Sequence, residues 1–402
     1  MISEFDVVPT IIGVLFLVLP ALLLGRLCSH FKIPEIIGFV FAGIVLGPTA
    51  LGGILPIFDK PIVELNEVMI ALWQISGIII LFSAGLHFTF HDLIKAGPNA
   101  AIIGICGVII PLTIGYFIVL QMGFDWTVAI IIGATLSATS IAVSVVILEE
   151  LGKDKTKEGN ILVNAAVLDD VLGLAILSVV ISIVTLKTIP TVESVVITTI
   201  TEVGFWFLIL LGAVYLLPKI VHVIAKTHPS TLEARGIRQG IALGSAFGLG
   251  AIAASVGLNP IVGAFAAGMG LAGSKLAVQV REFVGRLKVI VSPLFFAIIG
   301  SHVDITQISS INWTLFAVIF GVAVFSKILG CGLPAALLLK NKNGFRIGFG
   351  MVARGEVAFV VAGIGLAFEI FSDEIYSTIV FVILATIFIA PILLRNSFKE
   401  KN

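Results

Sequence analysis

Long apolar runs separated by short polar segments fill the chain from one end to the other. A helix that crosses a bilayer needs about 20 mainly apolar residues, and runs of that length recur about a dozen times. Apolar residues are continuous within each run, whereas the strands of a membrane barrel alternate apolar and polar side chains. The pattern predicts an all-α polytopic membrane protein with thirteen spans, at residues 9–27, 33–49, 67–88, 97–121, 126–150, 160–186, 195–218, 235–256, 258–274, 288–303, 311–339, 345–370 and 374–396.

Lys and Arg residues are concentrated in every second loop between the predicted spans. Twenty of the 24 Lys and Arg residues lie after odd-numbered spans or in the C-terminal tail, whereas only Lys60 and Lys187 lie on the opposite side. Lys and Arg are enriched in cytoplasmic loops, so the N-terminus is predicted outside and the C-terminus in the cytoplasm of a cell membrane. The remaining two, Lys327 and Arg354, fall inside predicted spans.

Composition supports the membrane assignment and excludes several other classes. The chain is 58% hydrophobic and 12% charged, against about 25% charged residues in an ordinary soluble domain. Its net charge is zero, so no nucleic-acid partner is expected. The three cysteines lie in separate apolar runs without metal-binding spacing, and the six histidines lie near span ends or in loops, where interfacial roles are commoner than ligation. Acidic residues precede the first span, which predicts a retained helix rather than a signal peptide.

An internal repeat links the two halves of the chain. IPEIIGFVFAGIVLG, starting at Ile33, resembles LNPIVGAFAAGMGLAG, starting at Leu258. The later tripeptide Gly85-Leu86-His87 similarly matches Gly300-Ser301-His302. The first match pairs the second span with the ninth, and a separation of seven spans gives the halves opposite orientations. We therefore expect two inverted six-span repeats around a linking seventh span, an architecture of many secondary transporters.

Charged side chains inside spans mark the candidate site. Asp169 and Asp170 lie in an otherwise apolar stretch of span six, together with Asn164. A carboxylate at the centre of a bilayer costs about 2.5–3.5 kcal/mol on insertion scales, so such residues are usually functional. Adjacent helical residues point about 100° apart, which predicts separate roles for the two acids. Lys327, in span eleven, is too deep to reach the surface easily, and the acids of span six are its available partners.

Span five contains four hydroxyl side chains close together, Thr135, Ser137, Thr139 and Ser140. This density suggests a locally broken helix whose carbonyls and hydroxyls can coordinate a small cation. Hydroxyl-mediated helix packing is the alternative interpretation.

Span twelve, the repeat partner of span five, carries opposite charges on either side of a glycine. Arg354 and Glu356 are two residues apart and would face about 200° apart on a regular helix, so they cannot pair well there. Either the helix breaks at Gly355 or each charge meets another element. The two charges can also serve only to neutralise the dipoles of half-helices.

These motifs together resemble the monovalent cation:proton antiporter-2 family, the bacterial and archaeal sodium–proton antiporters of NhaA-type fold. The resemblance covers essentially the whole chain through its characteristic segments, which are IPEIIGFVFAGIVLGP, LFSAGLHF, SATSIAVSVV, NAAVLDDVLGL, NPIVGAFAAG, SPLFFAIIG, SKILGCGLP and GMVARGEVAFVVAGIG.

The resemblance implies a division of the chain into functional parts. A core domain comprises residues 97–190 and 309–402, and spans five and twelve are unwound and cross in mid-membrane. Dimerisation-domain helices comprise residues 1–96 and 231–308, and residues 191–230 form a linker helix. A homodimer surrounded by membrane lipid is the expected assembly.

The same resemblance assigns roles to the polar residues. Asp170 is implied as the cation- and proton-binding carboxylate, with oxygen ligands from Thr139 and Ser140, while Asp169 pairs with Lys327. The implied function is exchange of a monovalent cation for protons by alternating access, serving pH homeostasis without a cofactor. Two acids favour Na⁺, with Li⁺ or K⁺ as further candidates, and electrogenic exchange.

Three other functions compete with this interpretation. The nearest is a Kef-like K⁺/H⁺ antiporter. That branch tends to have a neutral residue in place of the first acid, so Asp169 departs from it, as does the expected absence of a C-terminal nucleotide-binding domain. An intramembrane aspartyl protease needs carboxylates from two facing helices, whereas Asp169 and Asp170 are adjacent on one helix. A gated channel needs rings of like residues around a pore, which an inverted repeat does not supply.

Overall fold

The computed structural model describes residues 4–31, 33–57, 60–87, 89–186, 191–227, 232–274 and 276–398. Helices form almost all of this part of the chain, and the short strands β1 (Pro56–Ile57) and β2 (Lys60–Pro61) pair antiparallel. In chain order the helices are α1 (Glu4–His30), α2 (Glu35–Leu46), α3 (Leu51–Ile54), α4 (Glu67–Gly85), α5 (Phe90–Gln121), α6 (Trp126–Ser137), α7 (Ile141–Glu150), α8 (Lys157–Leu186), α9 (Val192–Thr227), α10 (Leu232–Ser255), α11 (Pro260–Ala272), α12 (Ala277–Ser301), η1 (Ile305–Ser310), α13 (Trp313–Lys327), η2 (Ile328–Gly332), α14 (Leu333–Leu339), η3 (Lys342–Gly344), α15 (Phe345–Gly350), α16 (Glu356–Ala367) and α17 (Asp373–Phe398).

The prediction of an all-α membrane protein is confirmed. Ten helical segments of the described chain are long and apolar enough to cross a membrane. The three remaining predicted spans contain α8, the short apolar helix α11, and the pair α15 and α16. Large apolar side chains on the outer surfaces of helices are exposed, including Leu19 and Leu23 of α1 and Leu208 of α9. Such surfaces suit contact with lipid rather than water.

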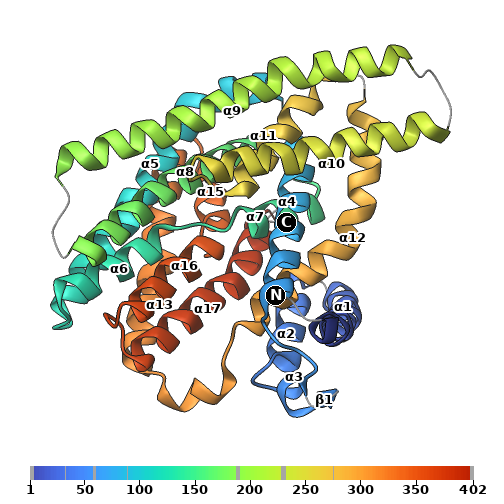
Figure 1. Cartoon of the computed structure of the whole chain (residues 1–402). Helices are drawn as coiled ribbons and strands as arrows, with labels where there is room; N and C mark the ends of the chain where they lie inside the picture. The colour runs from blue at the N-terminus through green and yellow to red at the C-terminus, as the bar shows by residue number, and fades with distance from the viewer. Residues whose placement is uncertain are drawn as a thin grey trace.

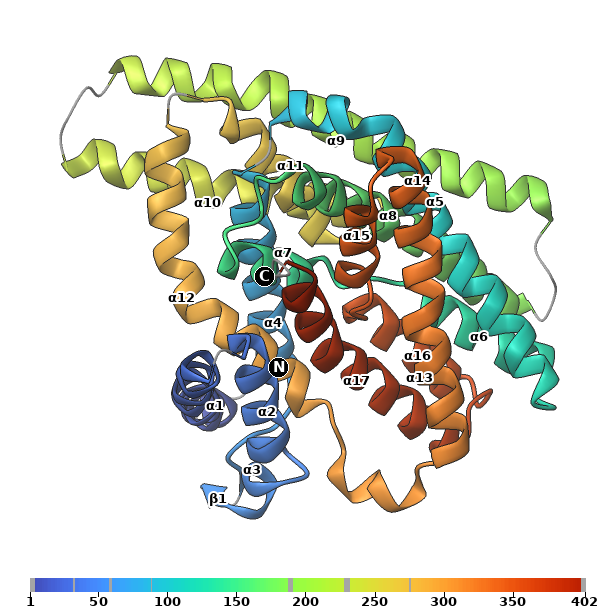
Figure 2. The ribbon, with the colours of Figure 1, turned by 180° about the vertical axis from the view of Figure 1, so that it is seen from behind.

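The helices pack into two groups (Figures 1 and 2). In one, which we call the scaffold group, α1 packs on α2, α12 packs on α2 and α4, and α11 packs on α4 and α10. In the other, the core group, α5 packs on α6, α8 and α13, while α17 packs on α13, α15 and α16. The long helix α9 contacts α11 and α10 of the scaffold group and α8 of the core group.

Close glycine contacts join helices within the scaffold group. Gly43 of α2 faces the backbone of α12 at Gly300, and Gly268 of α11 faces the backbone of α4 at Gly85. A side chain at any of these glycines would collide with the facing backbone, so small residues permit the approach. The residues in contact are those that the internal sequence match pairs between the two halves.

Several helices extend beyond the predicted spans, and α12 does so by the largest number of residues at one end. The tenth span was expected to begin at residue 288, but α12 begins at Ala277. The intervening Arg281, Glu282 and Arg286 read as a polar loop, yet charged residues are good helix formers and continue the helix beyond its apolar part. Hydropathy therefore located the apolar part of α12 and missed its polar first turns.

Two breaks interrupt the helices at the middle of the core group. Residues 138–140 are extended between α6 and α7, and residues 351–355 separate α15 from α16. A third irregularity is the π-helical turn η2, which directly follows Lys327 at the end of α13. Turns of this kind occur frequently at functional sites because they widen the helix and reorient side chains.

Candidate functional site

The two acids of span six are buried in the middle of α8. The exposed fraction is 0% for Asp169 and 3% for Asp170. The helix that carries them continues for 30 residues, so both side chains have fixed directions set by the helical turn. Their environment within the protein must therefore compensate each negative charge.

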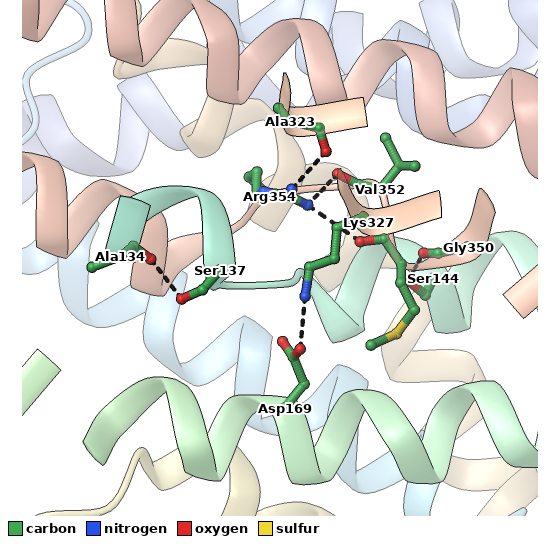
Figure 3. A network of polar contacts seen from close by, with 10 residues as sticks. Ala134, Ser137, Ser144, Asp169, Ala323, Lys327, Gly350, Val352 and Arg354 are labelled. Atoms are coloured by element: carbon green, nitrogen blue, oxygen red, sulfur yellow. Dashed lines mark hydrogen bonds and ion pairs between the residues drawn. The ribbon is translucent and has the colours of Figure 1, made fainter. Parts of the chain in front are cut away.

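Asp169 is compensated by Lys327, which is itself fully buried. Lys327 Nζ donates a hydrogen bond to Asp169 Oδ1 at 2.7 Å, between residues 158 positions apart in the chain (Figure 3). Both side chains have 0% exposure, so each depends on the other. Removing one member of a buried ion pair is costly because the remaining charge has no partner and no water.

A glycine that sequence reasoning missed makes room for this ion pair. Gly107 of α5 lies beside it, and a methyl group there would collide with Cys331 Sγ. The same methyl group would lie 3.3 Å from Asp169 Oδ1 and 3.7 Å from Lys327 Nζ. Nothing in the sequence separates Gly107 from the other helical glycines, because its constraint comes from two distant helices.

Replacing Gly107 with alanine is expected to destabilise the protein and disturb the ion pair. Overpacking a tight site typically costs about 1–3 kcal/mol. Gly97→Ala is the matched control, since Gly97 lies on the same helix with nothing within 4 Å of an added Cβ. Thermal unfolding of the purified variants should show a lower midpoint for Gly107→Ala alone. Equal midpoints for both variants would show that the space beside the ion pair is not tight.

The two helix breaks contact each other at the centre of the core group. The backbone N–H of Ser140 donates to the carbonyl of Ala353 at 2.8 Å. Ser144 Oγ donates to the carbonyl of Gly350 at 2.6 Å, and Gly355 packs directly against Ser140. Each break thus satisfies backbone groups of the other, as buried irregular backbone requires.

The four hydroxyls of span five divide into two kinds. Thr135 and Ser137 donate to carbonyls of their own helix at 2.8 and 2.7 Å, so they serve the local structure. Thr139 and Ser140 lie in the break, are buried, and have hydroxyl oxygens without a hydrogen-bond partner in the described residues. Of the four, Thr139 and Ser140 therefore keep oxygen atoms available for a ligand.

Arg354 lies fully buried at the second break and binds backbone carbonyls. Its Nη1 donates to the carbonyls of Val352 at 2.7 Å and Met351 at 3.3 Å, and its Nη2 donates to that of Ala323 at 2.8 Å (Figure 3). Its backbone N–H donates to Thr386 Oγ1 at 3.0 Å. The guanidinium therefore compensates the carbonyl end of α15, where the helix dipole is negative.

The two remaining predicted residues are Asn164, on α8, and Glu356, at the start of α16. The Asn164 side-chain N–H₂ donates to the carbonyl and to the side-chain oxygen of Asn160, both at 2.9 Å, which leaves Asn164 Oδ1 without a partner among the described residues. Glu356 begins α16, and its side chain lies outside the described part of the structure.

The arrangement suits a small cation. Oxygens of Thr139, Ser140, Asn164 and Asp169 are buried without a hydrogen-bond partner among the described residues, and α6 and α7, which flank the first break, pack against α8. Unsatisfied buried oxygens are unusual in native proteins and call for an explanation such as an ion. Carbonyl and carboxylate oxygens beside a broken helix are ligands for Na⁺ or H⁺ in membrane transporters.

Two cavities lie between the scaffold and core groups. One, of about 360 Å³, is lined by scaffold residues such as Glu35 and Lys288 and by Glu149 and Glu150 of α7. The other, of about 210 Å³, is lined by Trp73 of α4 and by Val357 and Val360 of α16, among others. The boundary between the groups is therefore incompletely packed at two separate places.

The chain matches known transporters over nearly its full length. The family model described as sodium/hydrogen exchanger, transmembrane, matches residues 15–399. The chain is 30% identical to the Na⁺/H⁺-K⁺ antiporter GerN of Bacillus cereus, over 94% of each chain. It is 29% identical to the high-affinity Na⁺/H⁺ antiporter NhaS3 of Synechocystis, over 93% of this chain and 87% of the relative.

A solved structure shares the fold. The sodium proton antiporter MjNhaP1 of Methanocaldococcus jannaschii matches with a TM-score of 0.67, at 18% identity and over 96% of both chains. The expected fold type is thus supported, although naming it after NhaA is less accurate than this match.

Proposed function

The chain belongs to the sodium/hydrogen exchanger family, and we propose that Asp170 is the carboxylate at which it exchanges Na⁺ for H⁺. The protein is a multi-pass membrane antiporter and not an enzyme. The buried position of Asp170 on α8, which packs against the helices that flank both breaks, carries the proposal. Thr139 and Ser140 supply oxygen ligands from the first break.

Exchange follows from competition for one carboxylate. A proton and a Na⁺ each neutralise Asp170, and binding of either displaces the other. A bare carboxylate is costly to carry past apolar walls, so the core moves only when it is loaded. Competition for Asp170 and the cost of moving a bare carboxylate are together sufficient to couple Na⁺ movement to H⁺ movement.

Lys327 supplies a second proton to each exchange cycle. It pairs with Asp169 through the 2.7 Å hydrogen bond, and we assign this pair to the site before a cation binds. Cation binding nearby weakens this pair, and Lys327 then releases its proton. More than one proton therefore moves for each cation, and exchange is electrogenic.

The finer architecture is part of the proposal. The core group (residues 97–190 and 309–402) moves against dimerisation helices (residues 1–96 and 231–308) that hold two copies together, and residues 191–230 link them. Thirteen spans form two inverted repeats. The equivalent glycine contacts of α2 with α12 and of α11 with α4 support this symmetry. The distribution of Lys and Arg supports a cytoplasmic C-terminus.

Cation selectivity is tested in liposomes with an imposed pH gradient and an internal pH-sensitive dye. We expect Na⁺ or Li⁺ to dissipate the gradient several times faster than K⁺ at equal concentration, because the Asp169–Asp170 pair is typical of sodium exchangers. The name of GerN makes K⁺ the necessary comparison. A response to K⁺ equal to or larger than that to Na⁺ would favour the Kef-like alternative.

A further inference from the structure

A third cavity lies within the scaffold group, between α10 and α12, which contact each other (Figure 1). Its volume is about 150 Å³, and its lining includes Arg238 and Gln239 of α10 and Gln279, Phe283 and Arg286 of α12. Sites for drug-sized ligands measure about 300–1,000 Å³. This cavity therefore has room for a small polar group and not for a molecule the size of a nucleotide.

Two arginines give the cavity its chemical character. Arg238 Nη1 donates to Gln279 Oε1 at 2.7 Å, and Arg286 Nε donates to the backbone carbonyl of Glu282 at 3.2 Å. A guanidinium has five N–H donors, and within the described residues neither arginine forms an ion pair. Glu282 also lines the cavity, so the lining carries two positive charges and one negative charge. A phosphate, which offers negative charge and several acceptor oxygens, matches these donors.

An exposed apolar surface continues from the cavity along α12. At 100° per residue, Gln279, Arg286 and Ile290 lie within about 40° of one another around the helix. Ile290 is 59% exposed, and the apolar part of the helix was predicted to begin at residue 288, just after Arg286. The cavity thus lies where the polar turns of α12 pass into its apolar turns. This order of polar and apolar surface is that of a phospholipid, with its headgroup followed by acyl chains.

We propose that Arg238 and Arg286 bind the phosphate of an anionic phospholipid, whose acyl chains lie along the exposed apolar surface of α12. The lipid connects α10 to α12 and stabilises the scaffold group. Basic pockets between membrane helices on the cytoplasmic side bind anionic headgroups in this way, and the distribution of Lys and Arg supports a cytoplasmic location for these helix ends. The inference does not depend on the transport role of Asp170.

The test is native mass spectrometry of the purified protein in detergent, with phosphatidylglycerol or phosphatidylcholine added at equal acyl-chain length. Both lipids carry a phosphate, but only phosphatidylglycerol has a net negative charge. We expect the wild type to bind phosphatidylglycerol about tenfold more tightly. Arg238→Gln and Arg286→Gln should each weaken its binding about fivefold, the contribution of one basic residue near anionic lipid. Equal binding of the two lipids by the wild type would overturn the proposal.

Two further variants make the result specific to this cavity. Arg26→Gln removes a scaffold arginine that lines the separate cavity with Glu35 and Glu149, and it should bind phosphatidylglycerol as the wild type does. Glu282→Gln removes the acid of the proposed site and should bind phosphatidylglycerol more tightly, a gain that misfolding cannot produce. Equal weakening by Arg26→Gln, or weaker binding by Glu282→Gln, would contradict the assignment.

A soluble phosphate offers the same acceptor oxygens, so the source of the phosphate is tested separately. Thermal unfolding of the wild type is followed with phosphatidylglycerol, glycerol 3-phosphate or inorganic phosphate. The proposal predicts a higher midpoint with phosphatidylglycerol alone, because the soluble compounds lack the acyl chains that contact α12. An equal rise with either soluble compound would assign the cavity to a soluble anion and overturn the lipid proposal.

Discussion

Replacing Asp170 with asparagine is expected to reduce Na⁺/H⁺ exchange to the level of protein-free liposomes. Asparagine has nearly the same size and remains neutral, so neither a proton nor a cation can bind it as each binds a carboxylate. Dye measurements under an imposed pH gradient give the exchange rate directly.

Two further variants make this result specific to the carboxylate. Glu282→Gln removes an exposed acid on α12 and should leave exchange unchanged. Asp170→Glu keeps the charge but displaces it, so reduced and measurable exchange is expected. Exchange by Asp170→Asn at a rate near that of the wild type would remove Asp170 from the mechanism.

Replacing Lys327 with glutamine should destabilise the protein strongly. The variant leaves Asp169 as a buried charge without its partner, and breaking such a pair typically costs about 3–5 kcal/mol. Thermal unfolding of the purified protein should therefore begin at a markedly lower temperature. The double variant Asp169→Asn/Lys327→Gln removes both charges and should recover most of the loss. A single variant as stable as the wild type would show that the pair contributes little.

The same variant also tests the charge movement. If Lys327 contributes the second proton, Lys327→Gln should exchange without net charge and lose its dependence on membrane voltage. The exchange rate under an applied potassium diffusion potential measures this. Voltage dependence equal to that of the wild type would assign the extra charge to another group.

Much of the fold could be predicted because lipid imposes a simple rule on sequence. Apolar length located helices at every predicted span, and the cost of burying charge identified Asp169, Asp170, Lys327 and Arg354 as unusual. The adjacent positions of the acids already implied that they face different surroundings. The buried contact between Lys327 and Asp169 is consistent with that reasoning.

Other features depend on contacts that sequence does not contain. Thr135 and Thr139 are the same residue type four positions apart, yet only the first donates to its own helix, because the helix breaks between them. Gly107 is constrained by Cys331 and the ion pair, which come from other helices. The Arg354 side chain donates to backbone carbonyls that have no helical partner because α15 ends there. Each of these becomes visible when distant segments are placed together.

The central claim is that Na⁺ and H⁺ compete for Asp170, and proton release on Na⁺ binding tests it most directly. Purified protein in weakly buffered solution with a pH indicator receives NaCl, with choline chloride as the control for ionic strength. The account predicts that Na⁺ alone releases protons, in proportion to the amount of protein, and that Asp170→Asn releases none. Binding of Na⁺ without proton release, or equal release by Asp170→Asn, would contradict it.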